Sequence, residues 1–174
     1  ETGPCRFLFL APHCADGWAI AGSRSVRLLR QLDQEKLREE PRKLIAEIED
    51  IKPRLSDAGL VIWDCRSIDE YEGTRRSAAR AGHIPGATHL DWLDLIDEQD
   101  HLKLIKNAEA LLQEHGIVRS KNIITHCQTH HRSGLTYMAA RLLGFPRIRA
   151  YHGSWSEWGN QTDTPIETGP PKRA

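Results

Sequence analysis

One cysteine, Cys127, stands where a thiol could act as a nucleophile, in a polar stretch between an apolar run and an amphipathic segment. The run before it, residues 121–126, is typical of a short buried strand. Residues 133–144 have the three- and four-residue apolar spacing of a helix, and Gly144 and Pro146 fit its end. Cys127 is therefore expected at the carboxyl end of a strand, just before a helix, where open α/β sheets bind ligands.

A cysteine in this position is activated by unpaired backbone N–H groups and by the helix dipole. The N–H groups of residues 128–133 can converge on the sulfur of Cys127 and hold it as the thiolate, which is the nucleophilic form. The dipole supplies at most about 2 kcal/mol, which lowers the pKa of the thiol by about one unit. The N–H donors and the guanidinium of Arg132 are expected to lower that pKa further. The predicted apolar face of the helix consists of Leu135, Met138, Ala139, Leu142 and Leu143.

Four segments resemble, in type and order, the motifs of the rhodanese family, the thiosulfate:cyanide sulfurtransferases. Residues 124–134 resemble the catalytic loop, in the Cys-Gln-Thr-His-His-Arg form of the catalytic domain of bacterial tandem-domain members. Residues 60–66 resemble the first strand with its Asp-x-Arg ending, and residues 82–87 match the Gly-His-Ile-Pro-Gly-Ala turn. Residues 153–158 resemble the closing Gly-Gly-x-x-x-Trp segment, with His152 in place of the first Gly. Four ordered motifs make this resemblance specific.

Strand and helix signals alternate along the chain, which predicts an α/β fold. The resemblance implies a rhodanese-like three-layer domain with a central, mainly parallel five-stranded sheet and helices on both faces. We expect strands at residues 60–63, 87–90, 121–126 and 148–151, a helix at 107–115 and a last short helix with Trp155 and Trp158. The predicted domains are a poorly defined N-terminal segment at 1–23, a charged helical linker at 24–55, the catalytic domain at 56–168 and a tail at 169–174.

The first two predicted segments have alternative interpretations. Residues 16–22 faintly resemble the end of a rhodanese domain, so residues 1–23 are either a remnant of a preceding domain or a terminus without regular structure. In the linker, the apolar stripe is formed by Leu37, Leu44, Ile48, Ile51 and Leu55. With Pro41 at a helix start, this stripe predicts two helices that meet there. They cover one face of the sheet or, alternatively, bind a partner helix.

The resemblance implies a double displacement through a persulfide on Cys127. A small anionic sulfur donor, thiosulfate or a related compound, would load the cysteine. Cyanide, glutathione or a dithiol protein would then accept the sulfur, and no metal or organic cofactor is required. The expected substrate-binding residues are Gln128, Thr129, His130, His131, Arg132, Ser133 and Trp92. The two histidines bind or steer anions when protonated or line the rim, and Trp92 walls the pocket, as its family counterpart does, or packs in the core.

Three other functions compete with this one. Dual-specificity phosphatases and arsenate reductases share the fold, but the phosphatase loop has five residues between its Cys and Arg, and this loop has four. His126, Cys127, His130 and His131 are metal-ligand types, although inward N–H groups would turn the loop side chains outward, and His126 is expected to pack under the loop. A binding module on an inactive fold is the third, and the intact Cys127 argues against it.

Charged residues near the motifs have structural alternatives too. Arg75, Arg76 and Arg80 form either a solvated loop or an electropositive rim that steers small anions. The resemblance implies that Asp64 and Arg66 tie the first strand to the following helix, with a role in substrate binding as the alternative. Cys65, between them, is expected to be a small buried apolar residue.

Composition narrows the function classes. Lys plus Arg and Asp plus Glu each number 24 in 174 residues, and zero net charge argues against a general nucleic-acid surface. No apolar run has the length of a membrane span, so no membrane partner is expected. The four cysteines include no CxxC pair, which favours free thiols and a cytoplasmic protein over a disulfide framework.

Overall fold

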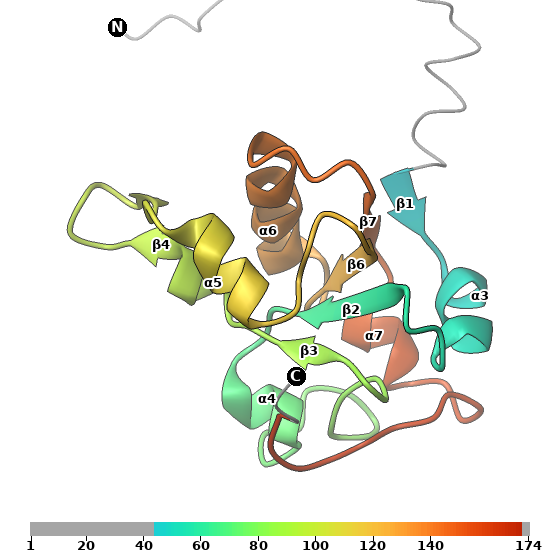
Figure 1. Cartoon of the computed structure of the whole chain (residues 1–174). Helices are drawn as coiled ribbons and strands as arrows, with labels where there is room; N and C mark the ends of the chain where they lie inside the picture. The colour runs from blue at the N-terminus through green and yellow to red at the C-terminus, as the bar shows by residue number, and fades with distance from the viewer. Residues whose placement is uncertain (1–43, 172–174) are drawn as a thin grey trace, which may run out of the picture. The chain divides into compact units, whose positions relative to one another are not determined.

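The structure is a computed structural model, and it describes residues 44–171. The predictions for residues 1–23, for Pro41 and for most of the linker lie outside the described residues. Within residues 44–171 the fold is built around one parallel sheet with helices on both faces (Figure 1).

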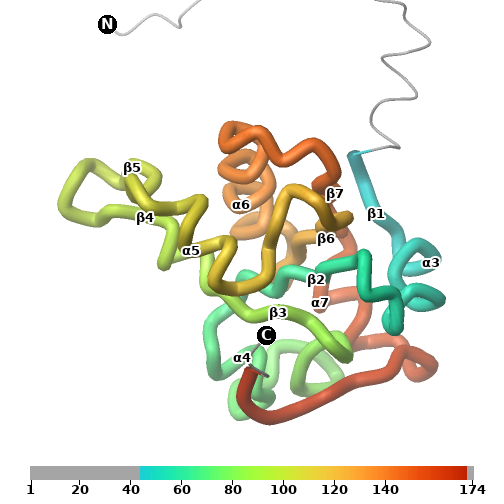
Figure 2. The backbone as a smooth tube through the Cα atoms, viewed as in Figure 1, coloured from blue at the N-terminus to red at the C-terminus, as the bar shows by residue number. Residues whose placement is uncertain are grey.

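The sheet has five strands in the order β1-β7-β6-β2-β3, and every neighbouring pair is parallel. The strands are β1 (Ile45–Ala46), β2 (Leu60–Asp64), β3 (Thr88–His89), β6 (Asn122–His126) and β7 (Ile148–Tyr151). This confirms the predicted mainly parallel five-stranded sheet. The longest pairing joins β2 to β6 and ends with Asp64 opposite His126, so the two strands finish side by side. Figure 2 shows β1, near the start of the described chain, beside β7, near its end.

Alternate residues of the central strands enter two separate hydrophobic clusters, as expected for a sheet covered on both sides. On β2, Val61 and Trp63 join one cluster and Ile62 the other. The first cluster includes residues of η3 (Trp92–Leu95), α5 (Ala108–Glu114) and α6 (His131–Leu142). The second includes residues of α3 (Ile48–Ile51), α4 (Ile68–Glu72) and α7 (Ser154–Trp158). The predicted three layers are therefore present, together with a small antiparallel pair, β4 (Ile96–Asp97) and β5 (Lys103–Leu104).

The predicted linker helix is wrong for the residues after 43. Residues Ile45 and Ala46 form an edge strand against β7, and only the short helices α3 and η2 (Lys52–Arg54) follow. Ile48 and Ile51 are buried as the apolar stripe required, but one helical turn is enough to bury both. Pro53 stands in the first turn of η2 and lacks the N–H that continuation of α3 would need. The hydrogen bonds between β1 and β7 stabilise this strand, and a pattern of apolar residues in the sequence does not predict them.

The predicted apolar face of α6 is also wrong in part. Leu142 is 79% exposed and Met138 54% exposed, whereas the buried residues are the small ones. They are Ser133, Thr136, Ala139 and Ala140. Thr136 shares a hydroxyl hydrogen bond of 2.7 Å with Thr125 of β6. The helix therefore packs closely on the strand that carries the cysteine, and at that distance only small side chains fit.

No helix among the described residues is long and apolar enough to cross a membrane.

Candidate active site

Cys127 follows the last residue of β6, and the loop that it opens is held from behind by α7. The N–H of Trp155 donates to the carbonyl of Cys127 at 3.0 Å, and that of Ser156 to the carbonyl of Gln128 at 2.9 Å. His130 caps α6 in the left-handed region, with a φ of 67°, which turns the chain sharply into the helix. With its carbonyls drawn toward α7, the loop has N–H groups free to turn toward the sulfur.

The thiol of Cys127 is held as a thiolate. Its pKa is lowered to about 4, and the largest contribution comes from the neighbouring thiol of Cys65. Burial opposes this shift, but the Ser133 hydroxyl and the backbone N–H groups of Ser133 and Thr129 lower the pKa further. The Ser133 hydroxyl lies 3.5 Å from the Cys127 sulfur. These contacts match the expected convergence of N–H donors and put a charged nucleophile at this position at neutral pH.

Arg132 points to a carboxylate instead of the sulfur. Its two terminal nitrogens donate to Glu70 of α4 at 2.6 and 3.0 Å. Burial would raise the pKa of Glu70, but the bonds from Arg132 and from Ser67 hold it below its ordinary value. The same pairing raises the pKa of Arg132. Arg132 is thus not among the largest contributions to the lowered pKa of Cys127, although its charge interacts with the thiolate as expected; its hydrogen bonds fasten the loop to α4.

The four residues between Cys127 and Arg132 face different ways. Gln128 exchanges two hydrogen bonds with Ser77, at 2.7 and 2.9 Å. The exposed Thr129 and His131 bond to each other at 3.0 Å. His130 lies 2.7 Å from the Ser133 hydroxyl. Since that hydroxyl gives its only proton to the thiolate, Nδ1 of His130 must donate to Ser133.

Burial lowers the pKa of His130 despite the nearby negative charge of Cys127. A neutral imidazole at this position supports the thiolate through Ser133 and does not offer a positive charge to a donor. The expectation that His130 steers anions when protonated is weakened accordingly, whereas His131 stays exposed.

Trp92 begins η3 and lies half-buried against the cluster that contains Cys127 and Cys65. Its backbone N–H donates to the carbonyl of Cys65 at 3.3 Å. Packing beneath the site is thus the contact that the structure shows for Trp92; its role as a wall for substrate stays a prediction.

Asp64 and Arg66 form a fully buried, two-pronged ion pair with contacts of 2.6 to 3.0 Å. Arg66 also donates to the carbonyl of Gly82 at 2.8 Å and lies over the ring of Trp155. The pair therefore ties the end of β2 to the turn at residues 82–87, not to the following helix as predicted. Gly82 has a φ of 117°, and a Cβ there would meet the carbonyl of Glu167 at 2.2 Å, which explains the glycine.

His126 packs under the loop, as expected. It is fully buried, its Nδ1 contacts the carbonyl of Cys127 at 3.2 Å, and burial lowers its pKa, so the ring is neutral. Across residues 44–171 the structure contains no group of three His, Cys, Asp or Glu side chains arranged to hold a metal ion.

Sequence reasoning missed two members of the site, Cys65 and Glu70. Cys65 was read only as core, yet it directly follows Asp64, which pairs with His126. Aligning the ends of the two strands in the sequence would have placed Cys65 beside Cys127. Glu70 was not among the expected site residues, and its position three residues after the helix-capping Ser67 was the available signal.

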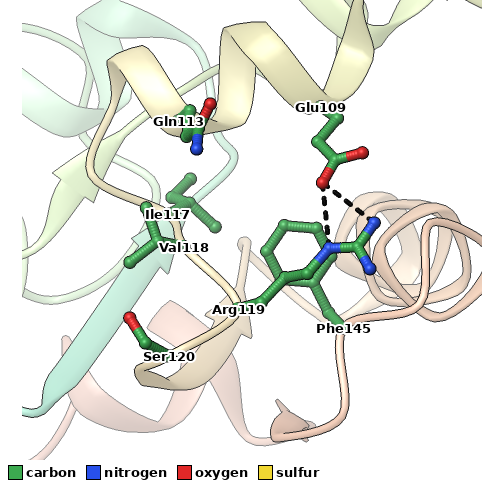
Figure 3. Close-up of a pocket in the computed structure, with 7 residues that line it drawn as sticks. All are labelled: Glu109, Gln113, Ile117, Val118, Arg119, Ser120 and Phe145. Atoms are coloured by element: carbon green, nitrogen blue, oxygen red, sulfur yellow. Dashed lines mark hydrogen bonds and ion pairs between the residues drawn. The ribbon is translucent and has the colours of Figure 1, made fainter.

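A pocket of about 240 Å³ lies at the other end of β6, between α5 and the segment that leads into the strand (Figure 3). Arg119 is its only cation, and the guanidinium bonds Glu109 at 2.9 Å and lies over the ring of Phe145. Because this charge is already paired, the lining of the pocket offers no unpaired cation to an anion.

Comparison with known proteins gives a consistent result. Residues 47–161 match the family of rhodanese-like domains. A thiosulfate sulfurtransferase of Pseudomonas aeruginosa is 49% identical over 117 residues, 67% of this chain and 43% of that protein. One of Azotobacter vinelandii is 52% identical over 114 residues, 66% of this chain and 42% of that protein. The chain thus spans less than half the length of these curated relatives.

A solved structure of EanB, with ergothioneine covalently linked with a persulfide cysteine, is similar with a TM-score of 0.68 and 28% identity. The similarity covers 75% of this chain and 33% of that one. Since the family match extends over most of the sequence, this chain belongs to the family of rhodanese-like domains.

Proposed function

We propose that this domain is a sulfurtransferase that moves a sulfane sulfur from thiosulfate, or a related anionic donor, to cyanide or a thiol acceptor. The observation that carries the proposal is the Cys127 thiolate, with its pKa of about 4, at the mouth of a loop whose N–H groups bond the sulfur. The thiosulfate sulfurtransferases among its relatives support the reaction class.

In the first half-reaction the thiolate of Cys127 attacks the outer sulfur of thiosulfate. A sulfur–sulfur bond forms to the cysteine, the sulfur–sulfur bond of thiosulfate breaks, and sulfite leaves with the bonding electron pair. The cysteine becomes a persulfide anion, whose terminal sulfur carries the charge. The N–H groups of Thr129 and Ser133, which bond the thiolate, are the nearest donors for that charge.

In the second half-reaction the acceptor attacks the terminal sulfur. Cyanide leaves as thiocyanate, or a thiolate of glutathione or of a dithiol protein leaves as a persulfide, and Cys127 regains its thiolate. Each half-reaction breaks one sulfur–sulfur bond and forms one new bond to the transferred sulfur, to sulfur or to the carbon of cyanide, so the proposed cycle needs no metal, cofactor or outside oxidant. It does need reduced thiols, and the free Cys65 and Cys127 fit a reducing, cytoplasmic setting.

Cys127 is only 1% exposed, so a donor reaches it only where side chains of the loop give way. The segment that Gln128 holds through Ser77 carries the exposed Arg75 and Arg76. These two arginines are the proposed electropositive rim that attracts a small anion. Arg80 does not belong to it, because its guanidinium bonds carbonyls of Trp158 and Thr164.

Two features disfavour a phosphatase or an arsenate reductase. The loop has four residues between Cys127 and Arg132, which leaves a narrow nest. The guanidinium that would bind a tetrahedral anion is already occupied by the carboxylate of Glu70.

The test is the mass of the intact protein after thiosulfate treatment. We expect a gain of one sulfur atom on Cys127, which cyanide reverses with release of one equivalent of thiocyanate. Hydrolysis of an activated aryl phosphate is measured on the same protein and should be absent. A protein that gains no sulfur from thiosulfate, or that hydrolyses the phosphate, would contradict the proposal.

A further inference from the structure

The end of β2 places a second cysteine directly against the nucleophile. The parallel ladder of β2 and β6 ends with Asp64 opposite His126, and the N–H of Cys65 continues it with a bond of 3.0 Å to the carbonyl of His126. The next pair along the two chains is therefore Cys65 and Cys127. Neighbouring parallel strands lie about 4.8 Å apart, so two side chains on the same face at this register are in contact.

Both cysteines do lie on the same face. They belong to the same hydrophobic cluster, and their exposed fractions are 0% and 1%. The carbonyl of Cys65 accepts from the N–H of Trp92 at 3.3 Å, so both backbone groups of Cys65 are bonded. Its side chain therefore lies in the same buried cluster as that of Cys127, at the end of the neighbouring strand.

The chemistry of the two thiols is complementary. Burial and the neighbouring Cys127 raise the pKa of Cys65 well above its ordinary value, so Cys65 keeps its proton. A protonated thiol has one S–H donor, and a thiolate beside it is an acceptor.

We propose that Cys65 is a positioning residue of the active site, whose S–H donates to the sulfur of Cys127 and holds it as a thiolate aimed out of the sheet. The inference rests on the proposed role of Cys127 as the nucleophile. It adds a donor from the strand to the donors from the loop, so that the charge is bonded from two sides.

The other charged and titratable groups around Cys127 cannot substitute for Cys65. His126 is neutral and bonds the carbonyl of Cys127, not its sulfur. Asp64 is paired with Arg66, and Arg132 with Glu70. The neutral His130 acts on the sulfur only through Ser133.

The experiment measures the rate at which iodoacetamide alkylates Cys127 as a function of pH, followed by mass. All proteins carry Cys5→Ala and Cys14→Ala, so that only Cys65 and Cys127 remain. Cys65→Ala should raise the pH of half-maximal alkylation by about one unit or more, because a donor to the charged form is lost. Cys65→Ser retains a donor and should leave that midpoint within a few tenths of a unit.

Two further variants separate the hydrogen bond from packing. Cys65→Val fills the site without a donor and should shift the midpoint as Cys65→Ala does, which keeps the test valid if either variant folds poorly. Ile123→Val removes one methyl group from the same cluster on β6 and should leave the midpoint unchanged. Equal midpoints in the parent, Cys65→Ala and Cys65→Val, or equal shifts in Cys65→Ser and Cys65→Ala, would overturn the proposal.

The measurement does not depend on sulfur transfer. If the midpoint shifts but thiosulfate loads no sulfur, the role of Cys65 stands and the proposed function fails. If sulfur loads normally and the midpoint never moves, the function stands and the role of Cys65 fails. If both the proposed function and the role of Cys65 are correct, the acid side of the pH profile of sulfur loading should move to higher pH in Cys65→Ala. In Cys65→Ser it should lie where it does in the parent.

Discussion

The ends of β2 and β6 lie side by side, and each is followed by a buried cysteine. The pKa values of the two thiols are nevertheless shifted in opposite directions. The pKa of Cys127 is lowered to about 4, while that of Cys65 is raised far above its ordinary value. Burial cannot explain the contrast, because it raises both pKa values and the exposed fractions are 1% and 0%.

Besides the effect of each thiol on the other, the chain that follows each strand contributes to the difference. After Cys65, the chain reaches Ser67 and enters α4, and the capping box turns Ser67 and Glu70 toward each other. After Cys127, the chain forms a loop whose N–H groups turn back to the sulfur. Cys127 thus receives donors from the loop in addition to the thiol of Cys65, whereas Cys65 stays protonated and serves as a donor.

The largest expected effect is the loss of sulfur loading in Cys127→Ala. Without the thiolate no persulfide forms, whereas Cys65→Ala still loads sulfur, at a rate lowered on the acid side of the profile. Intact mass after thiosulfate treatment checks both, with Cys5→Ala and Cys14→Ala as controls. A persulfide on Cys65 in the Cys127→Ala protein would remove the contrast between the two strand ends.

The second prediction changes the loop and leaves both cysteines in place. One Gly inserted between His130 and His131 gives five residues between Cys127 and Arg132, and Gly accepts the backbone angles that a wider loop needs. A lost N–H bond costs about 1–3 kcal/mol, so sulfur transfer should fall roughly 10- to 100-fold. The wider nest should also admit a phosphate, giving weak hydrolysis of an activated aryl phosphate. Undiminished sulfur transfer in the longer loop would show that its length does not select the substrate.

The fold class and the position of the nucleophile could be predicted from the sequence for a physical reason. Strands β2, β6 and β7 are mostly buried, β2 and β6 each contain consecutive apolar residues, and the catalytic loop is contiguous along the chain. The motifs at residues 60–66, 82–87, 124–134 and 153–158 lie in these strands and in the turns and the helix beside them.

The rest depended on contacts between distant segments. Strand β1 has two residues and exists because β7 offers hydrogen bonds, and nothing in its own composition marks it as a strand. The exposed face of α6 carries Met138 and Leu142 because close packing on β6 excludes large residues from the other face. The Arg132–Glu70 pair joins residues 62 positions apart, and its existence follows only from the adjacency of α4 and the loop.

The third prediction concerns pH and stability. The ordinary pKa of a cysteine is about 8.5, and that of Cys127 in the folded state is about 4. The ionised thiol therefore contributes its full stabilisation of the folded state at pH values above the pKa of the unfolded chain. This stabilisation is lost as the pH falls toward 4, at up to about 1.4 kcal/mol per unit. The free energy of unfolding, measured from pH 8 to pH 4 by urea titration, should therefore fall more steeply for the parent than for Cys127→Ala. Parallel curves would mean that the thiolate is not stabilised by the fold.

The fourth prediction removes the ion pair of Arg132 and Glu70, which joins the loop after β6 to α4 after β2. Glu70→Gln replaces the charge that holds Arg132, and a half-buried charged hydrogen bond of this kind is worth about 1–3 kcal/mol. We expect a lower melting temperature and a several-fold decrease in sulfur transfer, because the loop loses its anchor on α4. Asp69→Asn, on the exposed side of the same helix, is the matched control and should change neither. If Glu70→Gln also leaves both unchanged, the loop is held by α7 alone.

The smallest expected effect separates side-chain donors from backbone donors at Cys127. Ser133→Ala removes the hydroxyl that donates over 3.5 Å, a long contact, but leaves the N–H of residue 133 in place. The pKa of Cys127 should therefore rise by less than one unit, and the midpoint of alkylation against pH should move up by the same amount. Thr129→Ala is the comparison, because Thr129 contributes its N–H and its hydroxyl bonds His131 instead. It should leave the midpoint where it is. A shift in Thr129→Ala as large as that in Ser133→Ala would mean that both substitutions act by disturbing the loop, and that the direct bond from the Ser133 hydroxyl contributes little to the thiolate.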